Sequence, residues 1–203
     1  LANRLMARKC RYVLTSFPET AERFKNGKYC GSPLRKELFN GRRTEAIKKY
    51  GLAAGKKTVL VFGGGSGSRA INDGLRKYVS ALSRKYNVLH LCGKGNVVES
   101  NIPCYVQKEF EPDMGAAYAA ADLVVSRAGS NAIFEILALK KPSLLIPLEG
   151  QSRGDQAENA AYFQKRHLCR VLKQADMDFF PEAIEDALAD EELLSALAVS
   201  DFA

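Results

Sequence analysis

The segment VLVFGGGSGSRAIN, residues 59–72, joins four apolar residues to a run of glycine and serine, and then to the start of an apolar-periodic segment. Three consecutive glycines, Gly63 to Gly65, permit a backbone conformation or a close approach that other residues forbid. The pattern predicts a buried strand that turns sharply into a helix. What lies against the glycine turn has to be inferred from the rest of the chain.

Short, nearly continuous apolar runs alternate with helical patterns from Thr58 onward. Such runs are typical of strands buried on both faces of a parallel sheet. The expected strands are 58–62, 87–92, 103–107, 122–126, 143–147 and 168–172, and the expected helices between them are 71–86, 112–121, 131–140 and 155–165. Pro112 is expected in the first turn of its helix, and Ser130 or Asn131 is expected to cap the next one. The pattern predicts a Rossmann-like, doubly wound parallel α/β domain.

Residues 1–57 do not follow this alternation. Helical patterns are expected over 2–10, from 18 and over 37–52, a strand over 11–17, and a break at GSPLR, residues 31–35. The chain lacks an initiator methionine and opens inside an amphipathic pattern, so we expect a piece of a longer protein. Residues 1–35 would then be the end of a preceding domain and a linker, and residues 36–203 one domain that ends in a helical stretch, 181–203.

The net charge of +7 narrows the possible partners. Basic residues are dense in the first 57 positions, which indicates either a solvated surface or binding to phosphate groups or an anionic bilayer face. Nucleic acid is disfavoured because aromatic residues do not alternate with the basic ones as a stacking platform requires. No apolar run is long enough to span a membrane. The five cysteines are scattered without CxxC spacing, which indicates reduced thiols in the cytosol and argues against a metal site.

The glycine turn matches no specific phosphate-binding motif. A P-loop needs Lys and then Ser or Thr after its last glycine, whereas Ser68 and Arg69 follow Gly67 here. A dinucleotide motif would place its third glycine at Ser68, and no acidic residue ends the next strand. A strand, a glycine turn and a helix N-terminus can still bind an anion through free N–H groups. A tight turn with no ligand remains the alternative.

Two further segments follow neighbouring strands. In SRAGSNAIFEILALKKPSLLIP, residues 126–147, Glu135 lies early in a helix, where a carboxylate can accept both hydroxyls of a ribose. A solvent-facing glutamate without a ligand is the alternative at this position. In QSRGDQAENAAYF, residues 151–163, Asp155, Gln156 and Asn159 open another helix. Because parallel sheets bind ligands at the carboxyl ends of their strands, a nucleotide-sugar cleft is expected at this edge.

These segments, together with FEPDMGAAYAAADLVV, resemble in this order the MurG-like N-acetylglucosaminyltransferases of peptidoglycan synthesis. SFPET and GSPLR resemble that family's link between two Rossmann-like halves. The resemblance implies the C-terminal, donor-binding half of a GT-B glycosyltransferase. It implies transfer of N-acetylglucosamine, with inversion, from UDP-N-acetylglucosamine to a lipid-linked muramyl-pentapeptide, at the cytoplasmic face of the membrane. It implies no cofactor and no metal, and the chain has no Asp-x-Asp motif.

The resemblance also implies roles for particular residues. Arg35 and the turn at Gly65 and Ser66 would lie near the diphosphate, and the backbone of Phe110 and Glu111 would read the uracil edge. Glu135 would hold the ribose diol, and Gln156 would bind sugar hydroxyls. The remaining residues that would line the nucleotide are Ser130, Asn131, Ala132, Ile133 and Phe134. The family's usual loop is closer to GGSQGA, so Gly65 stands where the family has serine and Ser66 where it has glutamine. Ala132 stands where the family has threonine.

The half that would carry the acceptor site and the general base is absent from these 203 residues. We therefore expect no catalytic residue in this chain and no turnover by it alone. A membrane-lipid glycosyltransferase of the same superfamily and a non-catalytic nucleotide-binding module remain the alternatives, because both would share this donor-binding half.

Overall fold

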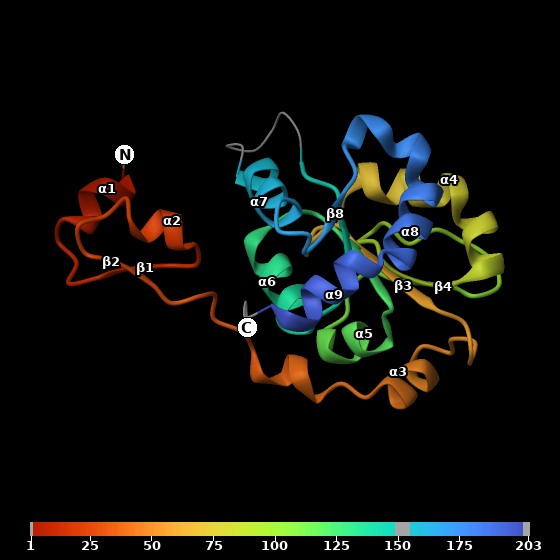
Figure 1. Cartoon of the computed structure of the whole chain (residues 1–203). Coiled ribbons are helices and arrows are strands. Elements are labelled where there is room, and N and C mark those ends of the chain that lie inside the picture. The colour runs from red at the N-terminus through yellow and green to blue at the C-terminus, as the bar shows by residue number, and fades with distance from the viewer. Residues whose placement is uncertain (1, 149–154, 201–203) are drawn as a thin grey trace.

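The computed structural model describes residues 2–148 and 155–200. A small N-terminal unit lies to one side of a larger α/β body (Figure 1). The unit contains α1 (Ala2–Ala7), β1 (Val13–Thr15), α2 (Pro18–Ala21) and β2 (Gly27–Tyr29). An extended connection then leads to the body, which begins with the 3-10 helix η1 (Lys36–Asn40).

A six-stranded parallel sheet forms the centre of the body, in the order β5-β4-β3-β6-β7-β8. Its strands are β3 (Thr58–Phe62), β4 (Asn87–Leu91), β5 (Tyr105–Lys108), β6 (Leu123–Ser126), β7 (Ser143–Leu145) and β8 (Arg170–Val171). Every residue of β3, β4, β6 and β7 is buried, as expected of strands covered on both faces. The predicted parallel α/β sheet is confirmed.

Helices cover both faces of the sheet (Figure 1). They are α3 (Arg43–Lys49), α4 (Arg69–Lys85), α5 (Met114–Ala120), α6 (Ser130–Ala138), α7 (Asp155–Gln164), α8 (Phe180–Ala189) and α9 (Glu191–Val199), with the 3-10 helix η2 (Gln174–Phe179) before α8. Alternate residues of β3 point to opposite faces: Leu60 and Phe62 pack with η1, α3 and α5, whereas Val59 and Val61 pack with α4 and α8. A third cluster joins α6, α7 and α9.

The N-terminal unit is a βαβ pair whose two strands are parallel, Val13 opposite Gly27. Phe17 attaches it to the body, with ring centroids 5.4 Å from Phe134 and 5.2 Å from Tyr162. Glu19 and Arg166 add an ion pair of 3.2 Å. The sequence analysis did not predict β2, because its residues, Gly-Lys-Tyr, show neither an apolar run nor an alternation.

Three helix predictions were wrong in detail. The helix expected over 37–52 is broken at Gly41, whose backbone is extended with a ψ of 136°. A Cβ at this position would lie 2.2 Å from the carbonyl oxygen of Gly115, so glycine is needed for the close contact with α5. The stretch expected to be helical from 181 is divided at Asp190, whose side chain caps α9. Pro112 lies outside its helix, because Asp113 is the N-cap of α5 and accepts from Ala116 N–H.

Candidate ligand-binding cleft

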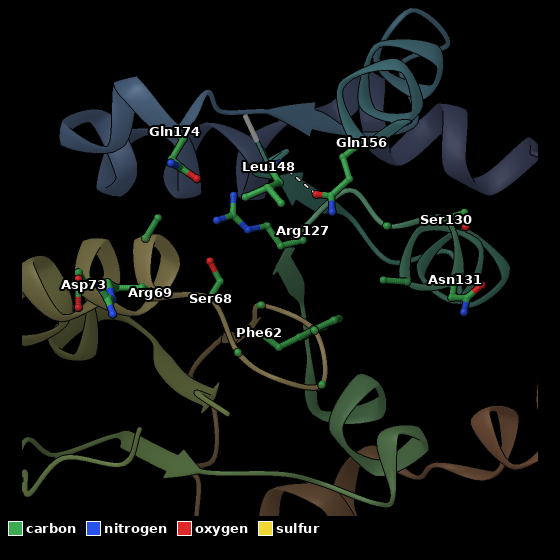
Figure 2. A pocket seen from close by; sticks show the side chains of 17 residues that line it. Phe62, Ser68, Arg69, Asp73, Arg127, Ser130, Asn131, Leu148, Gln156 and Gln174 are labelled. Atoms are coloured by element: carbon green, nitrogen blue, oxygen red, sulfur yellow. Dashed lines mark hydrogen bonds between the residues drawn. The ribbon is translucent and has the colours of Figure 1, made fainter. Parts of the chain in front are cut away.

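Two cavities meet at the carboxyl ends of the central strands. The larger has a volume of about 850 Å³ and is bordered by the starts of α4 and α6 (Figure 2). The smaller, of about 240 Å³, extends toward α5 and the loop after β5. The residues that border both are Phe62, Gly64, Gly65, Asn131 and Ala132. The glycine turn and the start of α6 therefore lie between two compartments of one cleft.

The glycines of the turn have two different roles. Gly67 has a φ of +78°, and a Cβ there would lie 2.1 Å from the carbonyl oxygen of Cys92, so this position needs glycine for the approach to the end of β4. Asn72 donates to the same Cys92 oxygen and holds α4 against β4. By contrast, a Cβ on Gly65 would meet nothing within 4 Å. Gly64 and Gly65 border both cavities, whereas Gly67 borders only the larger one and packs against the end of β4.

Two helix N-termini border the larger cavity. Ser68 caps α4, and its Oγ accepts from Ile71 N–H at 3.4 Å. At α6 the N-cap is Gly129, which makes no side-chain cap, so the expectation that Ser130 or Asn131 caps this helix is wrong. Ser130 is instead the first helical residue. First-turn N–H groups without helical partners, together with the helix dipole, favour an anion in this cavity.

Glu135 borders the smaller cavity and accepts hydrogen bonds from two side chains. Tyr118 donates its O–H to Oε2 at 3.0 Å, and Arg35 Nη2 lies 3.3 Å from Oε1. The Glu135 side chain is 18% exposed, so the carboxylate reaches the cavity without being fully solvated. Arg35 was expected near a diphosphate; the structure puts it beside Glu135, where it borders the smaller cavity and not the larger one.

Phe110 and Glu111, in the loop after β5, also border the smaller cavity. The Phe110 side chain is largely exposed. The Glu111 side chain is buried and accepts from Lys49 at 3.2 Å, from Lys108, and from Asp113 N–H at 3.0 Å. These three donors hold the backbone of the segment at the edge of the cavity.

Gln156, in the first turn of α7, borders the larger cavity, and its Oε1 accepts from Leu148 N–H at 3.0 Å (Figure 2). Asn159 turns away and donates to Ala128 O at 3.2 Å. The residues of the motif that precede Asp155, 151–154, lie outside the described part of the chain.

Three of the expected site residues do not border the cleft. The side chains of Ile133 and Phe134 are buried in the cluster of α6, α7 and α9, so within 130–134 only the first three residues line the cavities. Ser66 borders neither cavity, because its backbone turns toward Gly93, where a Cβ would lie 2.4 Å from the Ser66 carbonyl oxygen.

The sequence analysis missed several cleft residues. Arg127 reaches into the larger cavity between Ser68 and Leu148 (Figure 2), and its Nη1 donates to the carbonyl oxygens of Ile146 and Pro147 at 3.1 and 3.2 Å. A basic residue directly after a buried strand is a signal that could have identified it. No comparable local signal marks Tyr118, which borders the smaller cavity. The same is true of three residues that border the larger one, Arg69, Asp73 and Gln174.

Within the described ranges, no group of three or more His, Cys, Asp or Glu side chains could hold a metal ion. The helices of residues 2–148 and 155–200 include none long and apolar enough to cross a membrane.

Residues 58–197 match the family model described as "Glycosyltransferase family 28 C-terminal domain". Relatives at the level of sequence carry the name UDP-N-acetylglucosamine--N-acetylmuramyl-(pentapeptide) pyrophosphoryl-undecaprenol N-acetylglucosamine transferase. That of Clostridium botulinum is 43% identical over 184 residues, or 88% of this chain and 52% of the relative. The relative from Oceanobacillus iheyensis is 44% identical over 182 residues, which cover 87% of this chain and 51% of the relative. The chain thus spans about half the length of these curated relatives.

Solved structures with the same fold include MurG of Acinetobacter baumannii, with a TM-score of 0.69 and 20% identity, over 98% of this chain and 59% of that one. The glycotransferase of kitacinnamycin has a TM-score of 0.72 and 19% identity, over 93% of this chain and 49% of that one. Both alignments support the GT-B half that the sequence analysis expected.

Proposed function

The chain belongs to glycosyltransferase family 28, whose C-terminal domain model covers residues 58–197, and on this basis we propose that it is the UDP-N-acetylglucosamine-binding half of a peptidoglycan glycosyltransferase. The whole enzyme would transfer N-acetylglucosamine to a lipid-linked muramyl-pentapeptide, which is the reaction that the names of the relatives describe. We place this transfer at the cytoplasmic face of the membrane. The segment of residues 1–35 would connect this half to the one that binds the acceptor.

The observation that carries the proposal is the placement of Glu135 in a cavity that continues, past the glycine turn, into a larger one. A nucleoside, a diphosphate and a sugar follow one another in the donor in the same order as the smaller cavity, the turn and the larger cavity. Glu135 would accept the two ribose hydroxyls, and the backbone of Phe110 and Glu111 would meet the uracil edge. Gln156 would meet the sugar.

The diphosphate would lie at the N-termini of α4 and α6, with Arg127 nearby. In an inverting transfer the acceptor oxygen attacks the anomeric carbon from the face opposite the leaving UDP, so negative charge grows on the departing phosphate. Helix N-termini and a guanidinium stabilise that charge without a metal ion. The base that removes the acceptor proton would come from the half of the enzyme that these 203 residues do not contain.

Calorimetric titration of the chain with UDP and with 2′-deoxy-UDP tests the proposal. Glu135→Gln removes the negative charge from the proposed ribose acceptor, so we expect UDP affinity to fall by about 1–3 kcal/mol. The wild-type chain should bind UDP more tightly than 2′-deoxy-UDP, and the variant should discriminate less. Glu185→Gln is the matched control, because Glu185 pairs with Lys85 at the opposite end of α4 from the cleft. Equal affinity of the wild-type chain for both nucleotides would contradict the role of Glu135.

A further inference from the structure

The contacts of Glu135 raise the question of what keeps its carboxylate in one orientation. Glu135 reaches the cavity through three side-chain torsions, and the last of these is a soft one. Each carboxylate oxygen accepts from one side chain: Oε2 from Tyr118 and Oε1 from Arg35. The two donors differ in one respect that decides their roles, because Tyr118 is 1% exposed and the Arg35 side chain is 58% exposed.

Tyr118 is held firmly by its surroundings. It lies in α5, and its ring packs edge-on against Phe62 at the end of β3, with centroids 6.1 Å apart. Its helix is capped by Asp113 and packs closely on η1, since a Cβ on Gly115 would lie 2.6 Å from the carbonyl oxygen of Glu37. The phenol oxygen therefore occupies a position set by the core of the domain.

The direction of the Tyr118 hydrogen bond follows from the chemistry of the two groups. An ionised carboxylate only accepts, so Tyr118 must donate. Burial, and then the neighbouring negative charge of Glu135, raise the pKa of Tyr118, so the phenol keeps its proton. Arg35 is a weaker restraint, because an exposed ion pair contributes little and is screened by salt.

We infer that Tyr118 is a positioning residue for the nucleoside, whose O–H fixes the Glu135 carboxylate so that its remaining lone pairs face the ribose hydroxyls. A carboxylate has about four acceptor sites, and the two contacts of Tyr118 and Arg35 leave enough of them for a diol. Orienting the acceptor before the ligand arrives reduces the ordering cost of binding. The inference rests on the proposed function, since it takes Glu135 to be the ribose acceptor.

Tyr118→Phe tests it, because phenylalanine fills the same space in the core and removes only the donor. We expect UDP affinity to fall about threefold to tenfold, and affinity for 2′-deoxy-UDP to fall less, so that the ratio of the two shrinks. Tyr105→Phe is the matched control: it also removes a hydrogen bond inside the domain, 2.9 Å from Tyr105 Oη to Nδ1 of the buried His90, on the β4–β5 side of the sheet. The control should keep the wild-type ratio.

A second measurement separates positioning from packing. In a Glu135→Ala chain the Tyr118 hydroxyl has no carboxylate to orient, so adding Tyr118→Phe should leave UDP affinity unchanged. An equal loss in both backgrounds, or a wild-type ratio in Tyr118→Phe, would overturn the inference alone. A wild-type chain that does not distinguish UDP from 2′-deoxy-UDP would overturn the assignment of Glu135, and this inference with it.

Discussion

Replacing Glu111 by glutamine tests how the wall of the smaller cavity is held in place. The Glu111 side chain is 1% exposed, and its carboxylate accepts from Lys49, Lys108 and Asp113 N–H. Glutamine has almost the same shape. Its carbonyl oxygen can still accept from Asp113 N–H, but its NH₂ group cannot accept from Lys108 and leaves that ammonium facing a donor.

The expected loss follows from these contacts. Hydrogen bonds to charged groups contribute about 1.5–3 kcal/mol each. Lys49 and Lys108 are 38% and 34% exposed, so solvent screens both and each contributes toward the lower end. One full charged contact is lost and another is weakened, and we expect the free energy of unfolding to fall by about 2 kcal/mol at pH 7.

The loss should depend on pH in a defined direction. Burial raises the pKa of Glu111, but the hydrogen bonds from Lys108, Asp113 N–H and Lys49 outweigh it, so the net pKa lies below the ordinary 4.5. A depressed pKa means that the stabilisation is fully present above the unfolded value and is lost as the pH falls through the folded one. The difference between wild type and variant should therefore be constant near neutrality and shrink below about pH 4.5.

Urea denaturation followed by far-UV circular dichroism at pH 7 and at pH 3.5 measures both effects. Glu45→Gln is the matched control, because its pair with Arg42 is well exposed on both sides and should change stability by less than about 0.5 kcal/mol. If Glu111→Gln is as stable as the control at pH 7, or if its deficit grows in acid, the charged contacts do not hold this segment.

Two further predictions concern the cleft. Gly67→Ala should lower the free energy of unfolding by about 1–3 kcal/mol, because its Cβ would lie 2.1 Å from Cys92 O at a φ of +78°. Gly65→Ala should change that free energy by less than about 0.5 kcal/mol, since its Cβ would have open space, and equal denaturation midpoints for the two variants would refute this. Gln156→Ala should change UDP affinity by less than about 0.5 kcal/mol and reduce the preference for UDP-N-acetylglucosamine over UDP-N-acetylgalactosamine. Parallel titrations with UDP and the two UDP-sugars measure this, and an equal loss of affinity for all three ligands would contradict a sugar contact.

The sheet was predictable from the sequence because each of its central strands carries its own signal. Residues 58–62 are apolar or β-branched throughout, and all are buried in β3. The glycine turn and the helix after it were predictable for the same reason, since turn conformation and helix capping depend on neighbours a few residues apart. Glu135 and Gln156 could be chosen as site residues because each lies in a helix that directly follows a strand, and the carboxyl ends of parallel strands share one edge.

The features that were missed or misplaced depend on residues far apart in the chain. Gly41 ends η1 and packs on Gly115, and Glu135 accepts from Tyr118 and from Arg35, which is 100 positions away. Ile133 and Phe134 sit beside cleft residues in sequence but face the core, because only the packed α6 decides which side of the helix meets the sheet. Strand and turn patterns are local and therefore readable from the sequence, whereas the contacts between elements arise only when packing brings them within a few ångströms of each other.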